Sequence, residues 1–395
     1  MAAVTAFEQQ ILDGLKREHV VSLLQDLIQI PSVIHVDPEQ AVADTIAQYL
    51  GERGFSVEVD PVLPARPNVV GTYGRSGGRR LLFNAHMDVV PPGNGWTVDP
   101  VAGVIQYDKV FGRGAVDDKG PLAAMLAAAA ALALSGVPLT GEMVMCAVVD
   151  EENCSQGSRR LMQHLRGDMG IVGEPTSGSV VIAHKGSLRP LLKTTGRVGH
   201  TSRPEAAINA ISKMARVVEA IDAFHLELRK RTHSLTGGAS AAISRIQGGV
   251  GDNVIPDTCT ALLDRRLIPG ETEADALAEL EALFARLHAQ DPDLRVSIER
   301  LVPTTGGPAQ VDADSEVVRL VRDCAESVLG RAPELTGLGG ACDMVHLVNA
   351  GVPTVVFGPG DEHQAHQPDE HIEIEQLYQC ARVYLLVALR YLAAS

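Results

Sequence analysis

The sequence has no closely spaced pair of cysteines. Its six cysteines are scattered along the 395 residues, without a C-x-x-C motif. This usage favours a reducing compartment over a disulfide framework. We therefore expect the protein to be cytoplasmic.

The chain also lacks an excess of positive charge. It has 34 Lys and Arg against 49 Asp and Glu, so its formal net charge is −15 at pH 7. A chain of this sign is poorly suited to phosphate backbones and anionic lipid headgroups. This argues against nucleic acid or a membrane surface as the main partner, and we expect a small-molecule substrate.

No apolar run is long enough to be a convincing membrane span. The best candidate, residues 121–134, is mostly alanine and too short to cross a bilayer, so we interpret it as a buried helix. Residues 1–29 carry charged side chains among their apolar ones and lack the unbroken apolar core of a signal peptide. We predict that they form one amphipathic helix.

Several short apolar runs each end near an acidic or histidine side chain. The runs are residues 80–85, 142–149, 169–172 and 351–357. Short apolar runs separated by helices predict an α/β fold with a mixed, mostly parallel sheet that helices flank on both faces. Sites in such sheets lie beyond the carboxyl ends of the strands. We therefore expect one rim to gather the side chains that follow the runs: His86, Glu151, Glu152, Glu174 and His366.

A glycine-rich loop with two adjacent aspartates precedes the alanine-rich helix. Residues 112–120 read Gly-Arg-Gly-Ala-Val-Asp-Asp-Lys-Gly, with the carboxylates at Asp117 and Asp118. Glycine lets the backbone turn sharply and approach another group closely. Alone, the loop is also compatible with a surface turn that caps a helix. The neighbouring motifs favour a place at the same rim.

The middle of the chain has a different pattern. Residues 187–302 read strand, helix, strand, strand, helix, strand, which is the order of a split ferredoxin-like unit. A chain of this length favours two domains. We predict a catalytic domain formed by residues 1–186 and 303–395, with residues 187–302 inserted as a second, α+β domain.

The acidic residues of the rim predict bound cations. Two like charges about 4 Å apart repel by about 4 kcal/mol at an effective dielectric constant of about 20, and the motifs supply no equal number of Lys or Arg. Histidines mixed with carboxylates suit zinc, with cobalt or manganese as substitutes. One aspartate can bridge two metal ions roughly 3.5 to 4 Å apart.

With these motifs the chain resembles the di-zinc hydrolases that include acetylornithine deacetylase, succinyl-diaminopimelate desuccinylase, the aminoacylases and glutamate-releasing carboxypeptidases. The resemblance extends over nearly the whole length and rests on seven motifs in the same order. The motifs are His86-x-Asp88, residues 112–120, Asp150-Glu151-Glu152, Gly173-Glu174-Pro175, Gly199-His200-Thr201-Ser202, Asn253-Val254-Ile255-Pro256 and residues 365–370.

The resemblance implies a set of metal ligands. His86 and Glu174 would bind one zinc ion, and Glu152 and His366 would bind the other. Asp117 would bridge the two. The family also places a cis peptide bond after the bridging aspartate, here between residues 117 and 118.

The resemblance also implies roles for residues that do not bind metal. Glu151 would be the general base and acid, and Asp88 would accept the second ring N–H of His86. The inserted domain, residues 187–302, would be a lid and dimerisation domain, from which His200 would reach across a homodimer interface to the oxyanion. Its alternative is a helix-capping turn with an incidental histidine. The substrate would contact Asn253, Arg266 and the glycine-rich wall at Gly340, although structural roles for Asn253 and Arg266 stay open.

The function implied is hydrolysis of the amide bond of an N-acyl amino acid or related amine by water that two zinc ions activate. Glutamate at position 174 favours the deacylases over the aminopeptidases of the family. A carboxypeptidase or dipeptidase with the same metal centre is the alternative. A non-catalytic dimeric binding module is remote, because the chain retains Glu151 and all five implied ligands.

Overall fold

The computed structural model describes residues 3–394, which form two compact units. The first unit contains residues 3–182, 311–336 and 342–394. The second contains residues 183–310 and 337–341. The predicted insertion, 187–302, lies inside the second unit, which is longer at both ends. The short return at 337–341 places Gly340 in the second unit.

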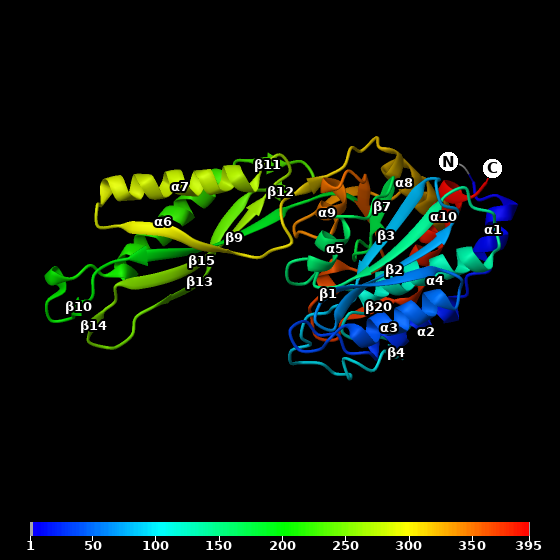
Figure 1. Ribbon diagram of the computed structural model, residues 1–395, viewed down its shortest axis with the longest axis horizontal. Helices are drawn as coiled ribbons and strands as arrows, with labels where there is room; N and C mark the ends of the chain where they lie inside the picture. The colour runs from blue at the N-terminus through cyan, green and yellow to red at the C-terminus, as the bar shows by residue number, and fades with distance from the viewer. Residues whose placement is uncertain (1–2, 395) are drawn as a thin grey trace. The chain divides into compact units, whose positions relative to one another are not determined.

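A mixed sheet forms the centre of the fold (Figure 1). Its strands follow the order β1-β2-β6-β3-β7-β19-β8-β17, and β18 also pairs with β8. The strands are β1 (Ser56–Leu63), β2 (Arg66–Gly74), β3 (Arg80–His86), β6 (Glu142–Val148), β7 (Met169–Val172), β8 (Val180–His184), β17 (Ala309–Gln310), β18 (Leu335–Leu338) and β19 (Thr354–Val356).

The four central strands of this sheet are parallel. β3 pairs with β6 and β7 in parallel, and β19 pairs with β7 in parallel, whereas β1, β2, β8 and β17 form antiparallel pairs. Every residue of β6 and β7 is buried, as expected for continuous apolar runs between helix layers. The predicted parallel centre is confirmed, and its strands end at the same edge.

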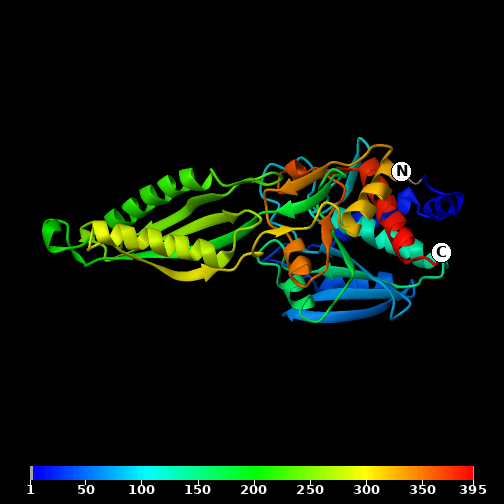
Figure 2. The same cartoon turned by 90° about the horizontal axis from the view of Figure 1, so that it is seen from above.

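Helices cover both faces of the parallel strands. α4 (Lys119–Leu134) and α10 (Ile374–Leu392) pack together and on β3 and β6, while α9 (Met344–Asn349) packs on β7 and β19 (Figure 2). α4 is buried almost all round, which explains its uniformly apolar composition. Within residues 3–394, no helix is long and apolar enough to cross a membrane.

The amino-terminal segment differs from the prediction. In place of one helix it forms α1 (Ala6–Leu12) and α2 (Arg17–Ile28). A capping box at Thr5 starts α1, and Asp13 ends it just before Gly14. The break lets both helices place apolar side chains against the core. The other helices of this unit are α3 (Gln40–Gly51), α5 (Gln156–Leu161) and α8 (Glu316–Leu329).

The second unit has the predicted ferredoxin-like topology. Its antiparallel sheet has the strand order β13-β15-β9-β16, and two helices lie along one face (Figure 1). The elements are β9 (Gly186–Thr195), α6 (Ala210–Leu228), β13 (Ser240–Gly248), β15 (Thr258–Leu267), α7 (Glu273–Gln290) and β16 (Arg295–Val302). Alternate residues of β15 are buried against the helices, which gives this unit its own apolar core.

Candidate metal centre

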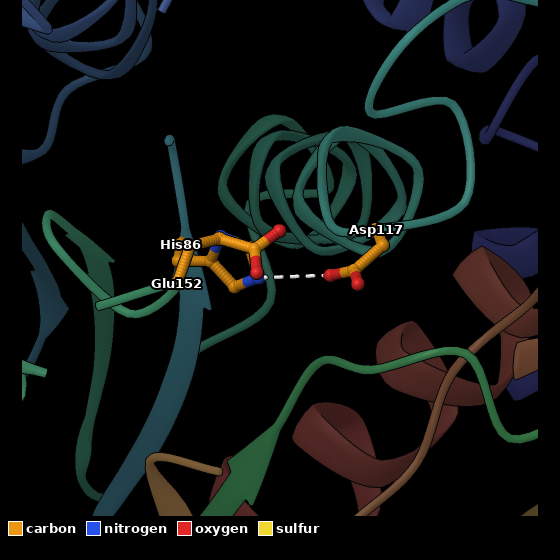
Figure 3. A group of neighbouring side chains, drawn as sticks. All are labelled: His86, Asp117 and Glu152. Carbon is orange, nitrogen blue, oxygen red and sulfur yellow. Dashed lines mark hydrogen bonds and ion pairs between the residues drawn. The ribbon is translucent and has the colours of Figure 1, made fainter. Parts of the chain in front are cut away.

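Asp117 lies between the two histidines of the predicted site. His86 is the last residue of β3, and its Nε2 lies 3.0 Å from Asp117 Oδ1 (Figure 3). His366 Nε2 lies 3.2 Å from the other oxygen, Asp117 Oδ2. One carboxylate therefore presents one oxygen to each imidazole, which is the arrangement needed to bridge two cations.

The three glutamates join the same cluster. Glu152 Oε1 lies 3.1 Å from His366 Nε2. Two sets of side chains have donor atoms within 4.8 Å of one another: His86 with Asp117 and Glu152, and His86 with Glu151 and Glu174. The structure thus brings together the five side chains that the sequence predicts as metal ligands. The donors, imidazole nitrogens and carboxylate oxygens, fit a pair of divalent cations.

The loop that presents Asp117 has the expected backbone geometry. The peptide bond between Asp117 and Asp118 is cis, which confirms that prediction. Asp118 is fully buried, and its Oδ2 accepts the backbone N–H of His86 at 3.0 Å. The two neighbouring aspartates therefore act differently, because Asp117 contacts the His86 ring and Asp118 its backbone.

Asp88 contacts His86 differently from the prediction. The ring Nδ1 of His86 lies 2.9 Å from the backbone carbonyl of Asp88, whereas the nearer carboxylate oxygen is 3.7 Å away. That carboxylate instead accepts the backbone N–H groups of Glu151 and Glu152, at 3.2 and 3.1 Å. Asp88 orients the ring through its main chain, and its side chain holds the turn that carries the glutamates.

The turn after β6 has a second anchor that the sequence did not reveal. Asp150 has φ of 68°, and its carbonyl accepts the N–H groups of Cys154 and Ser155. Its carboxylate lies 3.4 Å from Arg66 of β2, which also pairs with the buried Glu39. Arg66 and Glu39 belong to none of the motifs, so only the fold connects them to the site.

Comparison with known proteins identifies the family. The model of peptidase family M20/M25/M40 matches residues 82–390. The chain belongs to this family. It is therefore a hydrolase that acts on C–N bonds.

Two relatives and one solved structure illustrate the similarity. The chain is 32% identical to acetylornithine deacetylase of Proteus mirabilis, over 91% of this chain and 94% of that one. It is 32% identical to succinyl-diaminopimelate desuccinylase of Sphingopyxis alaskensis, over 94% and 97%. A dinuclear metal-binding M20 peptidase from Bacillus subtilis has the same fold, with a TM-score of 0.72, 17% identity, and coverage of 95% of this chain and 98% of that chain.

Burial dominates the electrostatics of this M20 site. Burial, together with nearby carboxylates, raises the pKa of Glu151 and of Glu174 well above the usual range. Burial also acts to raise the pKa of Asp117, but hydrogen bonds from His366 and His86 outweigh it and lower that pKa. Bringing these carboxylates together as anions therefore requires positive charge at the centre of the cluster.

The second unit contains His200, Asn253 and Arg266, which were predicted in the inserted domain, and also Gly340, which was predicted in the second part of the catalytic domain. His200 is the last residue of β10 (Gly199–His200), which pairs with β14 (Val254–Ile255), so it lies next to exposed Asn253. Arg266 of β15 donates to Asp264 Oδ1 at 2.7 Å. A Cβ at Gly340 would meet no atom within 4 Å beyond its chain neighbours. Their action on a substrate stays a prediction.

Removal of bound metal should lower the stability of the protein. Ligands that bind only the folded state stabilise it, by about 2.7 kcal/mol for one site at a free concentration of about 100 times Kd. Without cations the buried carboxylates must bind protons or repel one another. We expect a lower thermal midpoint after chelation and dialysis, measured by calorimetry, and recovery when zinc is added back. An unchanged midpoint in the dialysed protein would contradict a resident metal pair.

Proposed function

We propose that the chain is a metal-dependent deacylase that hydrolyses the amide bond of N-acyl amino acids or related N-acyl amines. The observation that carries this proposal is the position of Asp117, whose two oxygens lie 3.0 Å from His86 Nε2 and 3.2 Å from His366 Nε2. Its relatives in the family support the substrate class, because they are named as a deacetylase and a desuccinylase.

The ligand set proposed for the two cations follows the cluster. His86 and Glu174 hold one ion, Glu152 and His366 hold the other, and Asp117 bridges them. Zinc suits this mixture of imidazole and carboxylate, and cobalt or manganese would be substitutes. When bound, such ions supply the Lewis acidity that lowers the pKa of water and polarises an amide carbonyl.

Glu151 is the proposed proton carrier. It lies beside the ligands, it is nearly buried, and its pKa is raised by burial, as is common for catalytic carboxyl groups. It accepts a proton from the attacking water and returns that proton to the nitrogen of the leaving amine. The products are a carboxylic acid and a free amine.

The second unit is proposed to act as a lid and dimerisation domain, which makes the enzyme a homodimer. His200 would donate a hydrogen bond to the oxyanion in the site of a second copy, while Asn253, Arg266 and Gly340 would contact the substrate. The guanidinium of Arg266 suits a substrate carboxylate. A cytoplasmic location is supported by the six cysteines, all of which are free and buried.

An exopeptidase with the same metal centre is the second candidate. It is favoured by the fold shared with a dinuclear metal-binding peptidase of the family. The two candidates differ in the group that the pocket accepts on the acyl side of the amide bond. They share the proposed metal ligands and Glu151, so the ligand set does not separate them.

A substrate panel separates these candidates. We would measure amine release by the zinc- or cobalt-loaded protein from N-acetyl, N-formyl and N-succinyl amino acids and from dipeptides, with the Glu151→Gln variant as the control. Selective cleavage of one acyl series is the expected result. Cleavage of dipeptides alone would replace the deacylase proposal by the exopeptidase one, and no cleavage of any compound would contradict both.

A further inference from the structure

Two charged residues of the family motifs have no role in the proposed reaction. Arg113 belongs to the acidic loop and Glu370 to the motif that contains His366. The two side chains form an ion pair, and both are almost completely buried. Removing two charges from water is unfavourable unless their hydrogen bonds are well placed. The contacts of this pair therefore indicate what it does.

The carboxylate of Glu370 accepts hydrogen bonds from two consecutive backbone N–H groups, those of Val116 and Asp117. Its Oε1 accepts the N–H of Val116 at 2.8 Å and the N–H of Asp117 itself at 3.1 Å. Its Oε2 pairs with Arg113 Nη1. One oxygen thus holds the bridging aspartate by its main chain, and the other is tied to a guanidinium.

Arg113 is itself fixed in place. Its Nη2 donates to the carbonyl of Pro92 at 3.2 Å, and its guanidinium lies 5.3 Å from the centre of the Trp96 ring. The indole N–H of Trp96 donates to the same Pro92 carbonyl at 2.8 Å. The arginine therefore cannot turn away without breaking contacts with the loop after β3.

The same pair connects the chain segment that carries Asp117 to the segment that carries His366. Glu370 is four residues after His366, and its carbonyl accepts the N–H of Gly112 at 3.0 Å. The next residues form β20 (His371–Glu373), which pairs with β5 (Lys109–Phe111) directly before the acidic loop. Asp117 and His366 are far apart in sequence, and this junction places them side by side.

We propose that Glu370, anchored by Arg113, is a positioning residue that sets the spacing between Asp117 and His366. This inference rests on the proposed function, because it concerns the cation held by Glu152 and His366. The other cation shares the bridging Asp117, but its other two ligands, His86 and Glu174, lie at strand ends that Glu370 does not contact. The pair therefore controls the affinity of one metal position more than that of the other.

The test is zinc binding by the Glu370→Gln variant. Residues that orient metal ligands change metal affinity by about 10- to 100-fold when substituted. We expect calorimetric titration and elemental analysis to show one of two zinc equivalents weakened by that factor and the other changed little. Glu373→Gln is the matched control, because it removes an exposed glutamate of the same segment and should leave both equivalents unchanged.

A double-mutant cycle identifies the affected position. His366→Ala removes a ligand of that position, so adding Glu370→Gln to it should weaken the remaining zinc equivalent only slightly, through the shared Asp117. A further loss of about 10- to 100-fold in that equivalent would show that Glu370 does not act on one position more than on the other, and the proposal would be overturned. Wild-type zinc affinity in Glu370→Gln would overturn it too.

Glu370→Gln leaves Arg113 buried without its partner and could unfold the chain. The Arg113→Met, Glu370→Gln double variant has no buried charge at this place and keeps a carbonyl acceptor for the two amides. We expect it to fold, by circular dichroism, and still to bind the weakened zinc about 10- to 100-fold less tightly. Wild-type affinity in the double variant would show that the Glu370 carboxylate does not position the ligands, and would overturn the proposal. If the wild-type protein itself bound no zinc, the proposed function would fail instead.

Discussion

The Glu151→Gln variant is expected to lose about 10²- to 10⁴-fold in kcat while its zinc content stays at the wild-type value. Glutamine has almost the same shape as glutamate, but it cannot take a proton from water and pass it to the leaving amine. The Glu151 N–H would still be held by the carboxylate of Asp88, as in the wild-type chain. The turn and the neighbouring ligand Glu152 should therefore remain in place.

Zinc analysis of the same variant decides between two roles for Glu151. Its carboxylate lies within 4.8 Å of donor atoms of both His86 and Glu174, so it is close enough to bind metal. If Glu151 were a ligand, Glu151→Gln would lose zinc and activity together. If it carries only the proton, the variant retains its zinc and only kcat falls. Full activity in the variant would exclude both roles.

The parallel strands and the residues that follow them could be predicted from sequence, because strands buried on both faces are continuous apolar runs. β3, β6, β7 and β19 are short, largely apolar runs; β3 ends at His86, and Glu151 and Glu174 lie within three residues of the ends of β6 and β7. Parallel strands share one carboxyl edge, so separate motifs of this kind must converge. His86, Glu151 and Glu174 were found in this way, whereas their individual roles came from the family resemblance.

Contacts that join distant segments could not be predicted in the same way. The link from Glu39 through Arg66 to Asp150 depends on which strands become neighbours, and no local pattern records that. The backbone carbonyl of Asp88 lies next to His86 Nδ1, and the carboxylate of Asp88 accepts backbone N–H groups instead. The carbonyl and the carboxylate are both good acceptors, and the fold decides which of them meets the ring, so the residue type alone does not predict it.

The His200→Ala variant is expected to lower kcat by about 10²- to 10³-fold, the scale of one lost oxyanion donor. In the structure the backbone N–H of Ser202 donates to His200 Nδ1 at 3.1 Å. A ring nitrogen that accepts a hydrogen bond carries no proton, so the neutral imidazole has its proton on Nε2. His200 is exposed and presents that N–H as a donor. Wild-type kcat in the variant would remove His200 from the site.

Ser202→Ala is the control for His200→Ala. It removes the Ser202 hydroxyl, 2.8 Å from His200 Nδ1, but keeps the backbone N–H that selects the tautomer. We expect a much smaller change in kcat than for His200→Ala. Both variants should keep the proposed dimer in sedimentation experiments. A drop in kcat that accompanied dissociation would point to a role in assembly.

Mixing two inactive variants tests whether His200 acts on a second copy of the chain. In a mixed dimer of Glu151→Gln and His200→Ala chains, one site combines an intact Glu151 with an intact His200 from the other chain. Random exchange of subunits would then restore roughly a quarter of wild-type activity, because half of the dimers are mixed and each has one complete site. If His200 served the site of its own chain, every site would lack one group. The mixture would then be no more active than its parents, and the proposed exchange of His200 between subunits would be wrong.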